Sequence, residues 1–340
     1  MIQLDGTMGE GGGQVLRTAL ALSLATGRGF RVLGVRGRRK VPGLLRQHLV
    51  VVQAAARVSG ARVTGAEVGS THVTFEPRAI DGDAWSISVG SAGSATLVAQ
   101  TLAPALLLRS RPSTVTIEGG THNPGTPTLE FLAECWAPAL ASTGATLTLS
   151  LERHGFYPKG GGKIVLTTAA SRLGPLDLST RGALTSIEVR SALSESLPTH
   201  ILDRELGQAG RRLTRLGPRL TRAHVPSDGH GNAMTLIATY ERVRHVSTSL
   251  GELGVPAEEV ADDLVNDFER FDAGGAAVGP HLADMLPVAL ALGDGGRFVT
   301  GAPTSHLSTQ AALVPLFAPV TVDLSPHPDG TTLVEVRQRP

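Results

Sequence analysis

Hydrophobic and polar positions alternate between two periods along this chain, in an order that recurs. Short apolar runs typical of strands are followed by stretches with helical spacing, and a pair of alternating segments then closes each round. The first round predicts a strand over 1–6, a helix over 14–26, a strand over 30–36, a helix over 43–59 and a hairpin over 61–76. One β-α-β-α-β-β unit of about 80 residues is therefore expected to repeat, a period longer than those of common solenoids.

A second unit follows in the same order. It predicts a strand over 84–89, a helix over 94–108, a strand over 113–118, a helix over 128–142 and strands over 145–151 and 163–168. Proline stands just before the second helix of both units, at Pro42 and Pro127, and Gly60 follows the first of these helices. Proline at a helix start and glycine after its end are the usual boundary residues, so they support these limits.

The third unit resumes late in the chain. Its pattern predicts a helix over 280–292, a strand over 297–301, a helix over 307–317 and strands over 320–324 and 331–337. The intervening piece predicts a strand over 184–190, a basic helix over 200–215, strands over 233–240 and 243–248 and a helix over 256–271. We therefore expect a mixed α+β chain with a large domain over 1–181 and 273–340 and a small inserted domain over 182–272.

Composition is that of a globular protein. Hydrophobic residues make up 41% of the 340 positions and charged residues 18%, which separates the chain from disordered proteins. No run is long enough to cross a membrane, and the first residues lack the basic-then-apolar order of a signal peptide. Cys135 is the single cysteine, so no intramolecular disulfide can form, and we expect a cytoplasmic protein.

Positive charge gathers near the amino end although the net charge is only +1. From Arg17 to Arg46 the chain carries basic residues and no acid, next to the glycine triplet of Glu10-Gly11-Gly12-Gly13-Gln14. Such a run is often a solvated surface, but beside bare glycine backbone it also suits phosphate groups.

A second glycine triplet lies in the run His154-Gly155-Phe156-Tyr157-Pro158-Lys159-Gly160-Gly161-Gly162-Lys163-Ile164. Together the two triplets resemble the RNA 3′-terminal phosphate cyclase family, whose signature has the form His-Gly-x-x-Pro-x-Gly-Gly-Gly. The resemblance extends over nearly the whole chain. It implies the three-unit architecture shared in outline with enolpyruvyl transferases, with a small thioredoxin-like domain inserted.

His306, in Pro303-Thr304-Ser305-His306-Leu307, is the candidate nucleophile. A lone histidine at a helix start is ordinarily a surface or capping residue. The resemblance implies instead that it is adenylated by ATP with release of pyrophosphate, and that the RNA 3′-phosphate then takes the AMP. Attack by the neighbouring 2′-OH would expel AMP and close a 2′,3′-cyclic phosphate. A neutral imidazole is a competent nucleophile near neutral pH, which suits this chemistry.

Carboxylates are the candidate metal and nucleotide ligands. Glu10 beside the first triplet could hold Mg²⁺ or Mn²⁺, or could simply complement the dipole of the following helix. Asp284 lies in His281-Leu282-Ala283-Asp284-Met285, a segment that matches nucleotide-binding positions of the family; without the resemblance it is an acid in the first turn of a helix.

The resemblance also assigns further contacts. It places Arg17, Arg36, Arg39 and Gln47 around phosphates, Gln100 against the nucleotide, and Pro127 and Phe131 near the adenine, although core packing explains Phe131 equally well. Two positions depart from the family pattern: Met285 replaces the usual glutamine, which puts one contact to ATP in doubt, and His122 stands where bacterial relatives tend to carry an acid.

Other functions were weighed against an ATP-dependent cyclase with RNA 3′-phosphate ends as substrate. A non-catalytic relative acting in ribosome assembly would lack the histidine that this chain has at position 306. An enolpyruvyl-type transferase rests on fold analogy alone. Walker A, dinucleotide-binding, serine-hydrolase and zinc-finger spacings are absent from the sequence, and no pattern in it predicts an oligomeric state or contact with a membrane.

Overall fold

Four mixed four-stranded sheets organise the protein in the computed structural model, which describes residues 1–90 and 93–339. The first sheet has the order β1-β2-β4-β3 and the second β5-β6-β8-β7. Their strands are β1 (Ile2–Asp5), β2 (Phe30–Leu33), β3 (Arg62–Thr64), β4 (His72–Glu76), β5 (Ala84–Ser88), β6 (Ser113–Gly119), β7 (Leu147–Arg153) and β8 (Gly162–Thr168). In both, the first two strands are parallel and the other pairs antiparallel, so the predicted repeat is confirmed.

The third sheet repeats this order and corrects the prediction of where its unit begins. Its strands are β9 (Leu176–Leu178), β14 (Gly296–Thr300), β15 (Val320–Pro326) and β16 (Thr332–Gln338), arranged β9-β14-β16-β15. β9 was not predicted, because three residues show too little alternation to be recognised. It pairs in parallel with β14, Leu176 beside Gly296. The third unit therefore starts before the inserted piece, which interrupts its first β-α connection.

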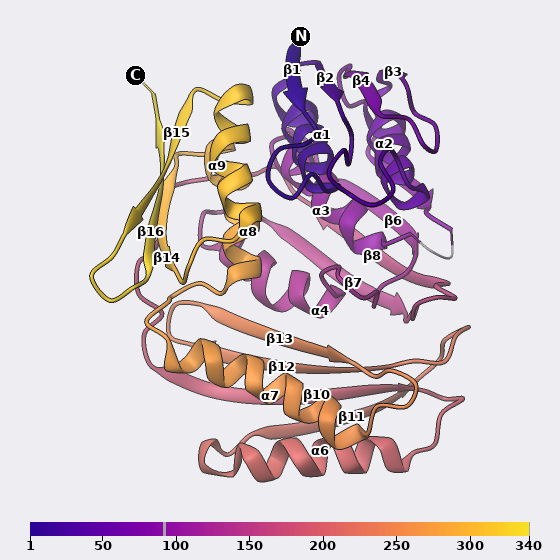
Figure 1. Cartoon of the computed structure of the whole chain (residues 1–340), viewed down its shortest axis with the longest axis vertical. Coiled ribbons are helices and arrows are strands. Elements are labelled where there is room, and N and C mark those ends of the chain that lie inside the picture. The colour runs from indigo at the N-terminus through magenta and orange to yellow at the C-terminus, as the bar shows by residue number, and fades with distance from the viewer. Residues whose placement is uncertain (91–92, 340) are drawn as a thin grey trace.

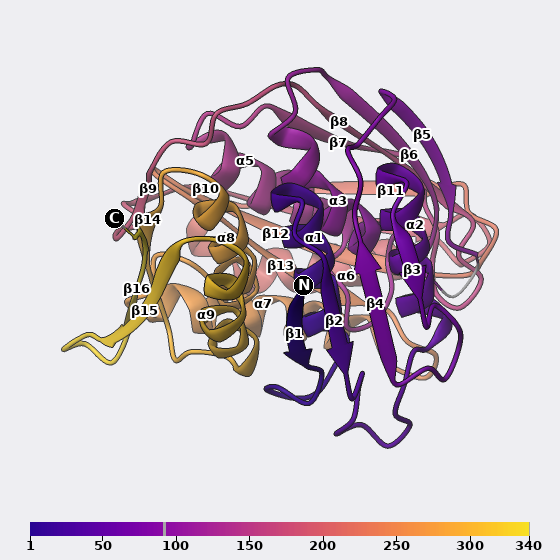
Figure 2. The ribbon, with the colours of Figure 1, turned by 90° about the horizontal axis from the view of Figure 1, so that it is seen from above.

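Helices fill the space between these three sheets. Seen from above, the sheets lie around the outside, while α1 (Gln14–Thr26), α3 (Ala95–Leu107), α8 (Pro280–Leu292) and α9 (Ser305–Phe317) lie between them (Figure 2). Helix α1 contacts α3, α8 and α9, so the loops at its amino end come close to those of the third unit. α1 and α8 are apolar on most sides, as expected of helices enclosed by other elements.

Two predicted helices differ from expectation. Helix α2 (Arg46–Ser59) begins four residues after Pro42, because Pro42 to Leu45 form an irregular loop. The helix predicted over 128–142 is divided into α4 (Leu129–Phe131), a π-helical segment (Leu132–Trp136) and α5 (Ala137–Ala141). Pro138 lacks the N–H that a regular α-helix would donate to the carbonyl of residue 134, and the hydrogen-bonding pattern widens there.

The fourth sheet belongs to the inserted piece. It has the order β11-β10-β12-β13, with β10 (Leu184–Ser194), β11 (Arg219–Val225), β12 (Asn232–Tyr240) and β13 (Arg244–Leu250). Helices α6 (His200–Arg212) and α7 (Ala257–Ala273) pack on each other and on this sheet, and a short 3-10 turn (Thr214–Leu216) follows α6 (Figure 1). The edge strand β11 was missed because five of its seven side chains are exposed, so it shows no alternation of buried and exposed positions. Arg204 and Arg212 of α6 pair with Glu258, Asp262 and Glu269 of α7.

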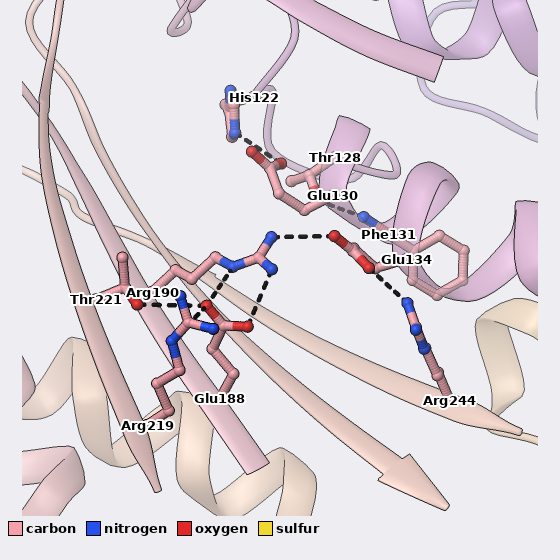
Figure 3. Close-up of polar contacts among 10 residues, drawn as sticks. All are labelled: His122, Thr128, Glu130, Phe131, Glu134, Glu188, Arg190, Arg219, Thr221 and Arg244. Atoms are coloured by element: carbon pink, nitrogen blue, oxygen red, sulfur yellow. Dashed lines mark hydrogen bonds and ion pairs between the residues drawn. The ribbon is translucent and has the colours of Figure 1, made fainter. Parts of the chain in front are cut away.

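A polar network joins this sheet to the second unit. Glu134 of the π-helical segment accepts hydrogen bonds from Arg190 of β10 (3.1 Å) and Arg244 of β13 (2.7 Å), and Arg190 also pairs with Glu188 (Figure 3). These carboxylates raise the pKa of Arg190, so its charge is fixed. In the described part of the chain no helix is both long and apolar enough to cross a membrane.

We expect Glu134→Gln to lower the free energy of unfolding by about 1–2 kcal/mol, because two arginines lose a charged acceptor in a partly buried contact. Calorimetry of the variant against wild type measures this. Glu67→Gln, at an exposed position, is the control. Equal unfolding temperatures for the two variants would show that the network adds nothing to stability.

Candidate active site

His306 lies in the first turn of α9, where a threonine fixes the helix start. Thr304 is the N-cap, and its hydroxyl accepts a hydrogen bond from the backbone N–H of Leu307 (2.9 Å). The imidazole that follows is 41% exposed, so it is accessible to a ligand instead of being enclosed in apolar packing. The capping sequence thus places one histidine at the free N–H groups of a helix end.

Two carboxylates from distant parts of the chain flank this imidazole. Glu10, in the loop between β1 and α1, places Oε2 at 3.9 Å from His306 Nε2. Asp284 of α8 places Oδ2 at 3.6 Å from His306 Nδ1. Each ring nitrogen therefore faces a different acid, and the first and third units meet at this histidine.

Neighbouring side chains hold both carboxylates in place. Ser305 Oγ donates to Glu10 Oε1 and Arg39 donates to Glu10 Oε2, both at 2.7 Å. The Ser305 hydrogen bond, followed by the charges of His306 and Arg39, holds the pKa of Glu10 below its usual value. Asp284 accepts a hydrogen bond from the Thr304 hydroxyl through its side chain and one from Gln310 Nε2 (3.1 Å) through its backbone carbonyl.

The first glycine triplet lies beside His306 and leaves no room for side chains. Gly11 has φ of 59°, in the left-handed region. A Cβ on Gly13 would lie 2.3 Å from the ring of His48. Gln14, which follows the triplet, donates from Nε2 to the backbone carbonyl of His306 (3.0 Å). The triplet therefore allows α1 to begin directly against the start of α9.

Arg17, one turn further along α1, carries a charge without a partner. The ion pairs in the described part of the chain include none to Arg17, and burial lowers its pKa to about 10. Burial, reinforced by Arg17 and Arg36, also lowers the pKa of His48 to about 4, so His48 is neutral and offers no second charge. Five predicted residues line one cavity of about 70 Å³ with Gln14, Trp136 and Gln310: Arg17, Gln100, Asp284, Met285 and His306.

Three other predicted residues line a second cavity. Phe131, His281 and Leu282 border a space of about 430 Å³ next to the inserted sheet. The rings of Phe131 and His281 meet edge to face, with centroids 6.2 Å apart. Because α8 begins between the two cavities, its residues 281 and 282 face one and residues 284 and 285 the other.

The remaining predicted residues line neither cavity. The guanidinium of Arg36 donates to the backbone carbonyls of Val41 and Gly43 and braces its own loop. Gln47 is exposed at the start of α2, Pro127 accepts a hydrogen bond from Thr96 through its carbonyl, and Ala283 is buried. Arg39 reaches the site only through Glu10.

The second glycine triplet lines a different pocket from the one beside His306. Gly161 and Gly162 border an open space of about 520 Å³ together with Arg153, Lys159 and Lys163. Arg153 is bound to Asp228 (3.0 Å) and Lys163 to Glu152 (2.9 Å). The two triplets therefore lie at two separate surfaces of the protein.

Sequence reasoning missed the residues that orient the site. Ser305 donates to Glu10, Thr304 donates to Asp284, and Gln14 donates to the backbone of His306. His48 lies close enough to Arg17 for the charge of the arginine to lower its pKa. Two sequence signals could have identified three of these residues: the pair Thr304-Ser305 at a helix start and the position of Gln14 directly after the first glycine triplet.

Comparison with known proteins identifies the family of this chain. The family model of RNA 3′-terminal phosphate cyclase matches residues 8–324. A protein of that name from Ralstonia nicotianae is 44% identical over 98% of this chain and 96% of its own length. One from Koribacter versatilis is 45% identical over 96% of this chain and 92% of its own length.

Among solved structures, the enolpyruvyl transferase NikO from Streptomyces tendae covers 98% of this chain and 82% of its own, at 14% identity and a TM-score of 0.30. A similarity of that size carries no conclusion about function. The family match and the sequence relatives span nearly the full chain. The chain therefore belongs to the RNA 3′-terminal phosphate cyclase family of enzymes.

Proposed function

We propose that this enzyme converts an RNA 3′-terminal phosphate into a 2′,3′-cyclic phosphate at the expense of ATP, through a covalent His306–AMP intermediate. The observation that carries the proposal is the position of His306, exposed at a helix start between Glu10 (3.9 Å) and Asp284 (3.6 Å). Membership of the cyclase family supplies the substrate class.

In the first step, Nε2 of His306 attacks the α-phosphorus of ATP. The bond from that phosphorus to the bridging oxygen breaks, and pyrophosphate leaves. Asp284 lies nearer to Nδ1 (3.6 Å) than Glu10 lies to Nε2 (3.9 Å), so we assign the proton to Nδ1 and the lone pair to Nε2. As the P–N bond forms, the ring becomes positive, and the carboxylate of Asp284 stabilises that charge.

In the second step, an oxygen of the RNA 3′-phosphate attacks the phosphorus of the bound AMP and the P–N bond breaks, which frees His306. In the third, the 2′-oxygen attacks the 3′-phosphorus, loses its proton and expels AMP. That attack is intramolecular, so positioning provides much of its rate. We assign phosphate binding to Arg17, Arg36, Arg39 and Gln47, and nucleotide binding to Gln100, Pro127, Phe131 and residues 281–285.

A divalent cation fits the oxygen donors at this site. Glu10 and Asp284 present carboxylate oxygens on either side of His306, and hard oxygen ligands are those that Mg²⁺ and Mn²⁺ prefer. Glu10 is the residue that would hold the cation, since its carboxylate is 48% exposed. When bound, the cation would neutralise charge on phosphate oxygens.

Glu10→Gln is expected to raise the Mg²⁺ concentration needed for half-maximal adenylation by about 10-fold or more, since a carboxylate ligand becomes a neutral amide. Titrating Mg²⁺ and Mn²⁺ into the labelling reaction measures this. Glu118→Gln, which removes an exposed carboxylate elsewhere, is the control. An unchanged titration in Glu10→Gln would remove this residue as a ligand.

Three RNA ends of the same sequence test the proposed function. An end with a 3′-phosphate and a 2′-OH should become resistant to phosphatase as ATP is split to AMP and pyrophosphate. A 2′-deoxy end with a 3′-phosphate should accumulate the adenylated form, since its attacking oxygen is missing. An end with 3′-OH should remain unchanged. Cyclisation without ATP, or no reaction of the first end, would contradict the proposal.

Two further proposals concern the cellular compartment and the domain organisation. Cys135 is buried, and burial raises its pKa to about 12, so it takes no part in thiol chemistry. We propose that the enzyme acts in the cytoplasm on RNA ends, and that residues 182–272 form a small domain of their own.

A further inference from the structure

Two histidines and a glutamate form a compact cluster outside the site around His306. His122 follows β6, His154 follows β7 and Glu130 lies in α4. One possible ligand atom from each residue lies within 4.8 Å of the other two. His122 is 2% exposed and the Glu130 side chain 18% exposed, so the cluster is largely shielded from water. The proposed cyclase mechanism uses none of the three.

The hydrogen bonds around Thr121 accommodate a His122 ring whose Nε2 is free of a proton. The Thr121 hydroxyl accepts from the backbone N–H of Gly155 (2.9 Å), lies 3.5 Å from the Gly155 carbonyl and lies 2.8 Å from His122 Nδ1. With its hydrogen directed at that carbonyl, the hydroxyl has one lone pair left for an Nδ1–H donor. His122 Nε2 and Glu130 Oε2 form a hydrogen bond of 2.9 Å (Figure 3), and a metal ion bound here would replace the proton between them.

The other two members complete the set of donors. Glu130 reaches the cluster from α4, and His154 reaches it from the end of β7. Two imidazoles and one carboxylate thus lie together in a shielded space.

From this geometry we propose that His122, Glu130 and His154 bind one zinc ion. Two histidines and a glutamate are a known three-ligand set for Zn²⁺, completed by water, and imidazole favours late divalent metals over Mg²⁺. Zinc bonds of about 2.0–2.1 Å allow two ligands to lie at most about 4.2 Å apart, so the cluster must contract by about half an ångström. The rings of His122 and His154 lie 13° from parallel with centroids 5.3 Å apart. Because an imidazole lone pair lies in the plane of its ring, one ring must also turn about its side-chain bonds before both nitrogens face the same ion.

The location gives the ion a structural role. His154 opens the signature run that carries the second glycine triplet, whereas His122 and Glu130 belong to the loop and helix after β6. One ion would tie these segments together. His122 also lines a cavity of about 650 Å³ between the second unit and the inserted sheet, which offers a route for entry.

The test uses full-length enzyme freed of metal with a chelator, and zinc alone as the probe. Zinc is titrated in competition with a chromophoric chelator, and Co²⁺ replaces it for absorption spectroscopy. The variants are His122→Asn and Glu130→Gln. His327→Asn is the matched control, because His327 forms an exposed pair with Asp329 (3.2 Å). Glu10→Gln removes a carboxylate from the site around His306 and reports any zinc bound there.

We expect one zinc per chain in wild type, His327→Asn and Glu10→Gln, and visible bands of four-coordinate Co²⁺. His122→Asn and Glu130→Gln should bind about 100-fold more weakly or worse, since even outer partners of metal ligands contribute about 10- to 100-fold. Circular dichroism verifies that each variant is folded. Equal zinc affinity in wild type and a folded Glu130→Gln would overturn the proposal, and would leave a protonated His122 paired with Glu130. The readout is independent of cyclase activity.

Discussion

His306→Ala should retain no radioactivity after incubation with α-labelled ATP and Mg²⁺ followed by denaturation, whereas wild type should retain an acid-labile label. Among the described residues, no other side chain at the site places a nitrogen nucleophile between two carboxylates. In the described structure that position is held by His306 alone, with Glu10 and Asp284 on either side. Overall cyclisation should fall by about 10⁴-fold or more, the range found when a covalent nucleophile is removed.

Supplying the later intermediate separates this role from structural damage. RNA that already carries the 3′-linked AMP needs only the final attack by its 2′-oxygen, so His306→Ala should cyclise it at a rate near that of wild type. His327→Ala, which replaces an exposed histidine, serves as the control and should label normally. Label surviving on a folded His306→Ala would remove the histidine from its proposed role.

Arg17→Met should stabilise the free enzyme and impair it at the same time. The guanidinium is partly buried, and this burial lowers its pKa to about 10. No ion pair among the described residues compensates its charge. Replacing it with an apolar chain of similar length removes an uncompensated charge, so the unfolding temperature should rise. A phosphate group would supply the missing counter-charge, so the KM for ATP should increase by about 10- to 100-fold.

Thermal unfolding with and without ATP distinguishes the two effects. Wild type should gain more stability from ATP than Arg17→Met does, because ligands stabilise by their affinity for the folded state. Arg31→Met, at an exposed position of β2, is the control for loss of charge alone. An unfolding temperature that falls in Arg17→Met, with unchanged KM, would mean that the arginine has a structural role.

The spacing of apolar residues was sufficient for elements whose own sequence carries a clear pattern. The long helices α1 and α8 agree closely with prediction, since apolar spacing and flanking glycine define them. β9 and β11 were not predicted, because they form strands by pairing with neighbouring strands and their own residues show no strand pattern. The π-helical segment was not predicted, because the apolar spacing over 128–142 does not reveal the wider hydrogen bonding that Pro138 causes.

The candidate site was predictable as residue types but not as distances. The resemblance named Glu10, Asp284 and His306, and the fold brings these three together from three separate segments. The resemblance also assigned Arg36 to phosphate binding, and in this structure its guanidinium donates to carbonyls of its own loop. The hydrogen-bond partner of an arginine depends on the conformation of its loop. The positive φ of 54° at Arg36 is part of that conformation, and no sequence pattern revealed it.

The early position of β9 has a consequence for how the chain is completed during synthesis. Leu176 leaves the ribosome well before Gly296, its neighbour in the third sheet, and the whole inserted sheet is made in between. The three residues of β9 remain unpaired until their partner strand β14 has been synthesised. Contacts so distant along the chain form late. His306 comes later still, so under the proposed mechanism a nascent chain cannot carry AMP until nearly all of it has been translated.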